Sequence, residues 1–197
     1  LSPDTEMIPH NIGGKYQPDA YRYCAGYQYD DRTIVGFSHT HFNGTGHSDL
    51  GDILIMPTTG KIQMEMGTAE NPENGYRSRF SHDKEHAELG YYSVMLDDYN
   101  VKAELTATER TGVHRYTYPK GEGNIILDLS YGIYNYDGKV LMSNLRVEDE
   151  YTLTGYRITQ GWSRMNYVHF AIKSSKPIKN YGCKTDDKPK YTGWWRK

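Results

Sequence analysis

The sequence predicts an all-β protein, an antiparallel β-sandwich, and three observations carry the prediction. Nineteen tyrosines stand against four phenylalanines, and tyrosine suits a strand that is buried on one face and wet on the other. Residues 101–108 alternate strictly between apolar and polar, which is the period of a half-buried strand. Short segments of this kind recur between clusters of glycine, proline and asparagine, as in sandwiches built from many short strands.

The strands expected in the second half of the chain follow one another closely. Residues 97–100 (Asp-Asp-Tyr-Asn) form a hairpin turn signal, and 119–123 (Pro-Lys-Gly-Glu-Gly) mark a loop. In the last predicted strand Val168, Phe170 and Ile172 share one face. The predicted strands are 91–96, 101–108, 113–118, 124–130, 151–158 and 167–173.

Helix signals are sparse. Only residues 81–87 combine a candidate N-cap, Ser81, with charged helix formers. We expect about two helical turns there and otherwise a chain without helices.

Composition excludes several functional classes. Twenty-three basic and 25 acidic residues give a net charge of −2 without a Lys/Arg run, so a nucleic-acid partner is not expected. The longest apolar run, around residues 53–56, is too short to span a membrane. Two cysteines, Cys24 and Cys183, are too few for a disulfide scaffold, and whether they pair stays open.

The two ends of the sequence suggest an incomplete domain. Leu1-Ser2-Pro3-Asp4 reads like the exit from a strand, and the chain finishes on Trp194-Trp195-Arg196-Lys197. Residues 1–197 are long enough for one domain with a real core. We therefore expect a single β-sandwich domain that is cut at both ends from a longer chain.

One stretch, residues 36–52 (GFSHTHFNGTGHSDLGD), concentrates the chemistry. If 37–42 is extended, His39 and His41 project from the same face, with Thr40 opposite. Glycines at 44 and 46 allow a ligand or another backbone to approach closely. Two imidazoles beside such a loop predict a polar concavity.

Three interpretations of this stretch compete. The histidines could be hydrogen-bonded parts of a buried turn. His39 and His41 could ligate zinc, together with a third ligand from among His47, Asp49 or Asp52. The imidazoles could also hydrogen-bond a substrate, and the residues alone do not decide between these readings.

Motifs along nearly the whole chain, in a consistent order, favour the third interpretation. Together they resemble glycoside hydrolase family 92, the calcium-dependent exo-α-mannosidases of gut Bacteroidetes. The matching segments are 26–31, 34–41, 44–46, 51–57, 80–82, 90–94, 103–108, 114–116, 124–128 and 155–157.

The resemblance implies a two-domain enzyme in which an N-terminal β-sandwich packs against a C-terminal (α/α)6 barrel. It implies hydrolysis of terminal mannose from N-glycans or mannans with inversion, by a Glu acid and an Asp base. Acid, base and most ligands of a bound calcium would lie on the helical domain. This chain would then hold no catalytic residue and no metal ligand. It would be inactive alone, and the enzyme would be secreted, periplasmic or on the bacterial cell surface.

Under this resemblance the chain supplies one wall of the sugar pocket. The substrate-binding residues expected from it are His39, His41, Gly44, Thr45, Gly46 and His47.

Two other functions remain open. The chain could be a non-catalytic carbohydrate-binding module, or a structural partner whose histidines brace an interface. Acidic pairs such as Asp97-Asp98 and the run at 148–150 read as turn or surface residues. Trp162 and the terminal tryptophans could stack on sugar, although packing between domains is the expected role.

Overall fold

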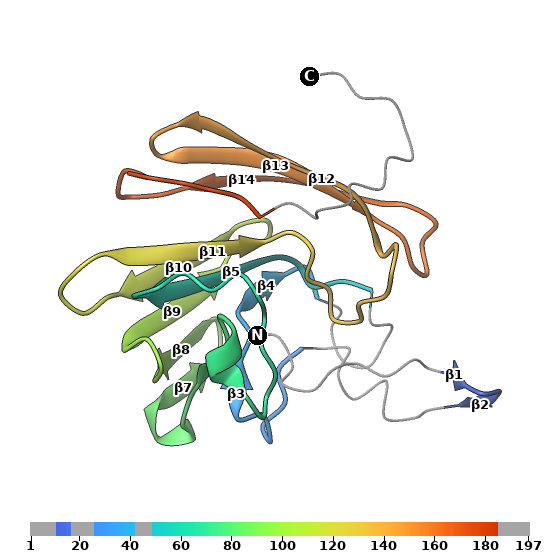
Figure 1. The fold of residues 1–197 in the computed structure, drawn as a ribbon, viewed down its shortest axis with the longest axis horizontal. Helices are drawn as coiled ribbons and strands as arrows, with labels where there is room; N and C mark the ends of the chain where they lie inside the picture. The colour runs from blue at the N-terminus through green and yellow to red at the C-terminus, as the bar shows by residue number, and fades with distance from the viewer. Residues whose placement is uncertain (1–10, 17–25, 42–48, 185–197) are drawn as a thin grey trace.

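The computed structural model describes residues 11–16, 26–41 and 49–184, and Figure 1 shows them as layers of strands. Within these ranges there is no α-helix, and every strand pairing is antiparallel. The all-β prediction is therefore confirmed. The strands are β1 Asn11–Ile12, β2 Lys15–Tyr16, β3 Thr33–Ile34, β4 Phe37–His39, β5 Asp52–Thr59, β6 Ser78–Arg79, β7 Glu85–Glu88, β8 Tyr91–Leu96, β9 Val101–Ala107, β10 Gly112–Thr117, β11 Gly123–Asp128, β12 Val140–Asp149, β13 Thr152–Thr159 and β14 Asn166–Lys173, with short 3-10 turns at Pro72–Asn74 and His82–Lys84.

These strands form three main sheets. The first has the order β10-β9-β8-β7, the second β11-β5-β4 and the third β12-β13-β14; β1-β2 and β3-β6 are two-stranded ladders. In Figure 1 the third sheet lies as a separate layer above β11 and β5.

The hydrophobic core joins the first two sheets. Leu54 of β5, Leu96 of β8 and Val101 of β9 are fully buried, and alternate residues of each strand join them. Phe37 of β4 is 1% exposed, and burying a side chain of that size contributes about 1.5–3 kcal/mol. This packing fixes the end of β4, where the predicted site begins.

The third sheet is buried only in part. Val168, Phe170 and Ile172 share its half-buried face, as the alternation predicts, while Leu145 in β12 is 44% exposed. Its strongest inward anchor is Arg157 of β13, which is 1% exposed. The outer layer is thus held by polar contacts more than by an apolar core.

The helix expected at 81–87 is wrong. Ser81 does cap a turn, since its hydroxyl accepts from the Asp83 amide at 3.3 Å, but only one 3-10 turn follows. Residues 85–88 become β7 and pair with β8 through a turn at Gly90, whose φ is +78°. Pairing with a neighbouring strand outweighs the local helix propensity.

The strands expected from 91 onward are confirmed, with ends shifted by one or two residues. Two long strands lacked a sequence signal. β5 is a mostly apolar run because both of its faces are buried. β12 is largely exposed and mixes apolar with polar residues. The hairpin turn at 97–100 is confirmed, with Asn100 at φ +52°.

Several expectations fall outside the described residues. Both chain ends, including Leu1 and Trp194, belong to the ranges that are not described, as does Cys24, while Cys183 is exposed. In the described part of the chain, no helix has the length and apolar character needed to cross a bilayer.

Candidate functional site

The backbone turns sharply where β4 ends. Thr40 has φ +58° and Ile53 has φ +55°, and such angles cost a β-branched residue about 1–3 kcal/mol each. The extension expected over 37–42 therefore stops at His39, and the simple alternation of His39, Thr40 and His41 does not hold. Backbone strain of this kind is concentrated at functional sites.

Hydrogen bonds hold the turn in place. The Thr40 hydroxyl donates to Asp52 Oδ2 at 2.6 Å, and the Gly51 amide donates to the Thr40 carbonyl at 2.7 Å. These contacts offset the strain at Thr40. They fix the two points where the chain leaves and re-enters the sheet around residues 42–48.

His39 is oriented by the backbone of β5. Its Nδ1 lies 2.7 Å from the Ile53 carbonyl oxygen, so Nδ1 carries the proton that is donated. In the neutral ring Nε2 then presents a lone pair. The ring stacks on His114 of β10, with centroids 5.0 Å apart and planes at 14°.

His114 stacks on His39, and His41 lies near enough for the charge of His39 to affect its pKa; these three residues are called the imidazole cluster. His114 Nδ1 lies 2.6 Å from the Tyr116 hydroxyl, and His41 Nε2 lies 2.8 Å from Ser38 Oγ. Burial lowers the pKa of His41 to about 4 and that of His114 to about 4, and the nearby His39 adds to both shifts. Both rings are therefore uncharged at neutral pH.

Gly112 leaves room for this cluster. A Cβ added there would lie 3.0 Å from His39 Nε2 and 3.4 Å from His114 Nε2. Any side chain at position 112 would displace the stacked rings of His39 and His114. The absent Cβ thus leaves the space in which the two rings stack.

The neighbouring carboxylates form ion pairs with basic side chains. Asp52 and Arg157 are both 1% exposed, and their charged groups approach to 3.5 Å. Burial lowers the pKa of Arg157, since removing a charged group from water is costly. Asp49 accepts from Lys139 Nζ at 2.8 Å and from the Trp162 amide at 2.6 Å. Neither carboxylate is positioned as a metal ligand beside His39.

The residues described here do not fit a metal. Zinc needs a third ligand beside His39 and His41, and calcium needs six to eight oxygens. Among the described residues, no group of three His, Cys, Asp or Glu side chains could hold an ion. No chemical step of this chain is therefore assigned to zinc or calcium.

The predicted site residues divide into two groups. His39 stacks on His114, which the sequence did not mark as a site residue, while His41 bonds to Ser38, the neighbour of His39 in β4. No local signal marks His114, because only the pairing of β10 with β9 brings it beside β4. Four other predicted residues, Gly44, Thr45, Gly46 and His47, lie outside the described residues.

Trp162 lies at the edge of this region. The residue is 82% exposed, and its backbone amide donates a hydrogen bond to Asp49. The acidic pair at 97–98 has structural roles, since Asp98 accepts from Arg79 and Asp97 from Lys84. The described acidic residues thus offer no acid–base pair next to the histidines.

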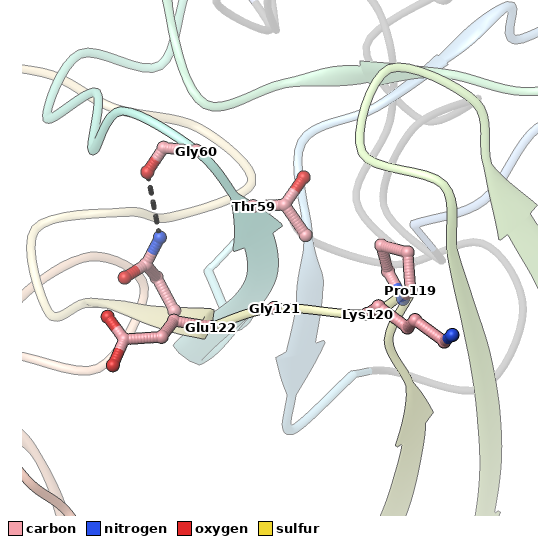
Figure 2. A pocket seen from close by; sticks show the side chains of 7 residues that line it. Thr59, Gly60, Pro119, Lys120, Gly121 and Glu122 are labelled. Atoms are coloured by element: carbon pink, nitrogen blue, oxygen red, sulfur yellow. Dashed lines mark hydrogen bonds between the residues drawn. The ribbon is translucent and has the colours of Figure 1, made fainter.

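A hollow at the far end of β5 has no comparable chemistry. It has a volume of about 500 Å³ and lies between Thr59 and the loop at 119–124. Figure 2 shows Lys120 and Glu122 pointing in opposite directions, and Asn124 Nδ2 donates to the Gly60 carbonyl at 3.1 Å. Its polar groups do not converge.

Comparisons with known proteins match the chain to one family. The family model described as the glycosyl hydrolase family 92 N-terminal domain matches residues 1–194. No curated protein matches the chain.

Solved structures of a family GH92 α-mannosidase from Bacteroides thetaiotaomicron are also similar. One structure contains mannoimidazole and the other does not, and both are 44% identical to this chain with a TM-score of 0.76. The match covers 81% of this chain and 21% of the mannosidase chain. A second GH92 glycosyl hydrolase, ccman5, is 27% identical with a TM-score of 0.59 over 75% of this chain and 20% of that one. The chain thus spans about a fifth of the length of these solved relatives.

Proposed function

The chain belongs to glycosyl hydrolase family 92, as its N-terminal domain, and on that premise we propose that it forms one wall of the sugar pocket of an exo-α-mannosidase. The substrate would be the terminal mannose of an N-glycan or mannan. The family relation and the α-mannosidase among the solved relatives support this proposal.

The imidazole cluster is the observation that carries it. His41 and His114 are uncharged at neutral pH because burial lowers the pKa of each to about 4. Uncharged rings suit a neutral, hydroxyl-rich ligand. His39 directs Nδ1 to the Ile53 carbonyl, so in its neutral form Nε2 can accept from a sugar hydroxyl. A charged substrate would instead favour a cation or a carboxylate here.

The reaction itself would be performed elsewhere in the enzyme. Inverting hydrolysis needs one carboxyl group to protonate the leaving oxygen and another to activate water. Asp49 and Asp52 are held in ion pairs with Lys139 and Arg157, so neither is suited to the role of acid. We propose that a second, helical domain supplies a Glu acid, an Asp base and the calcium ligands.

This division of labour predicts an inactive chain. Residues 1–197 alone, incubated with an aryl α-mannoside and calcium, should release no product above buffer. Turnover that persists through purification would contradict the proposal. Detection of the intact protein in the cytoplasm would contradict the further expectation of a secreted, periplasmic or cell-surface enzyme.

The role of the histidines is tested with His41→Ala in the intact protein. A sugar group left buried and unpaired costs about 1–3 kcal/mol, so kcat/KM should fall roughly ten- to a hundredfold while the melting temperature changes little. His86→Ala is the matched control, since that side chain is 62% exposed.

Other outcomes identify other roles. A lower melting temperature with near-normal kinetics would make His41 structural. Activity lost on chelation and restored by zinc would indicate a metal site. Normal turnover by a stable variant would remove His41 from the sugar pocket, and glycan binding without hydrolysis by the intact protein would favour the carbohydrate-binding module.

A further inference from the structure

A second hollow lies beside the first sheet, where residues of β7, β8 and β9 contribute to its lining. Its volume is about 550 Å³, within the range of about 300–1,000 Å³ that is typical of small-ligand sites. Three tyrosines, Tyr27, Tyr29 and Tyr92, line it around the carboxylate of Glu85. Ala87, Leu105 and His82 complete the lining.

Glu85 is fixed by three donors. The Tyr92 hydroxyl donates to it at 2.6 Å and the Tyr27 hydroxyl at 3.1 Å, while His82 Nδ1 lies at 2.5 Å. An ionised carboxylate has about four acceptor sites. One remains for a ligand hydroxyl.

His82 is hydrogen-bonded at both ring nitrogens, and the bond to Glu85 raises its pKa. Its Nδ1 faces the Glu85 carboxylate and its Nε2 lies 2.8 Å from the Tyr29 carbonyl oxygen. Both partners only accept, so both nitrogens donate. His82 and Glu85 therefore cancel each other's charge, and the hollow is neutral overall.

Tyr29 provides a flat surface beside the carboxylate. Its ring lies 4.2 Å from the His82 ring with the planes at 5°, yet the residue is 71% exposed. One face is thus fixed by stacking while much of the ring remains open to solvent. Aromatic faces of this kind pack against the apolar face of a ligand ring.

The hollow and the histidine cluster share one face of the sheet. Directly opposed residues run across four strands, from Ala87 through Tyr92 and Leu105 to His114. Tyr92 and His114 are two strands apart, a separation of about 10 Å.

We propose that this hollow binds a further hexose unit of the glycan whose terminal mannose lies at the histidines. Tyr29 stacks on the sugar ring, and Glu85 accepts from one of its hydroxyls. A neutral, partly aromatic hollow with one free acceptor fits an uncharged hexose. The choice of a mannose-containing glycan rests on the proposed function.

The test is affinity electrophoresis of the intact protein through gels containing yeast mannan or dextran. Mannan should retard the unaltered protein, and Tyr29→Ala should weaken the interaction roughly five- to tenfold because the stacking is lost. Tyr29→Phe should bind normally, since it keeps the ring. Tyr181→Ala is the matched control, because that residue is 77% exposed.

Three results would overturn the proposal: no retardation of the unaltered protein by mannan, equal retardation of Tyr29→Ala, or equal retardation by dextran. Hydrolysis separates this failure from that of the proposed function. If the unaltered protein cleaves no mannoside, the proposed function is wrong, whereas the electrophoresis still decides whether the hollow binds glycan.

Discussion

The imidazole cluster near β10 and the single histidine His82 near β7 have opposite electrostatic character. At the β10 end, His41 and His114 are buried without a carboxylate partner, and the pKa of each is lowered to about 4. At the β7 end, the hydrogen bond to Glu85 raises the pKa of His82. The comparison teaches that neighbours decide the role of an imidazole. Burial without a carboxylate favours the uncharged ring at one end, while the hydrogen bond to Glu85 favours the protonated ring at the other.

The largest effect is expected from removing the carboxylate at the charged end. Glu85→Ala leaves the hydroxyls of Tyr27 and Tyr92 without their acceptor, and the loss should lower the free energy of unfolding by about 2–4 kcal/mol. Urea unfolding measures it. Glu88→Ala, on the same strand but with a side chain 63% exposed, should change stability by less than about 0.5 kcal/mol.

Equal stability of the two variants would contradict this distinction. It would mean that Glu85 is no more important to the fold than a surface carboxylate. The comparison between the two ends of the sheet would then fail.

A smaller effect is expected from crowding the uncharged end. Gly112→Ala places a Cβ 3.0 Å from His39 Nε2, so the ring must shift by a few tenths of an ångström. We expect kcat/KM of the intact enzyme to fall roughly three- to tenfold, because displaced contacts cost a fraction of a hydrogen bond.

Gly182→Ala is the control for that change, since nothing lies within 4 Å of an added Cβ there. Unaltered kinetics for Gly112→Ala, together with an unaltered melting temperature, would show that the position of His39 does not matter for turnover.

The pH dependence of stability tests both ends together, and the two ends contribute with opposite sign. Between about pH 6.5 and 4 the unfolded chain protonates His41 and His114 before the folded chain does, so stability falls as the pH falls. His82 has a raised pKa, so its contribution is complete below about pH 6.5 and is lost as the pH rises through the folded value.

Histidine ring signals in an NMR pH titration separate these contributions. The signals of His41 and His114 should titrate near pH 4, and that of His82 above its ordinary value. A common midpoint near the ordinary value for all three would show that the two ends do not differ.

The sequence predicted where strands occur better than which strands pair with one another. Residues 101–108 gave a strand because alternation is a local property, whereas β5 has no alternation since both its faces are buried. Residues 81–87 were misassigned because pairing with β8 is not visible locally. The alternation of apolar and polar residues therefore identifies half-buried strands. It misses strands that form because they pair with, or are covered by, distant segments.

The same limit applies to the site. His39 and His41 stand next to a glycine loop in the sequence, and their local spacing made them candidates. His114 and Glu85 depend on which strands pair, so no short motif marks them. Their roles emerge only once the order β10-β9-β8-β7 is known.

The central claim is that the imidazole cluster contacts the terminal mannose, and a crystal structure of the intact protein with a bound mannose-derived inhibitor tests it directly. The measured quantity is the distance from sugar oxygens to His39 Nε2 and to the His41 ring. We predict at least one such distance within about 3.2 Å, a normal hydrogen bond. A sugar bound with all these distances beyond reach, and no bridging water, would contradict the account.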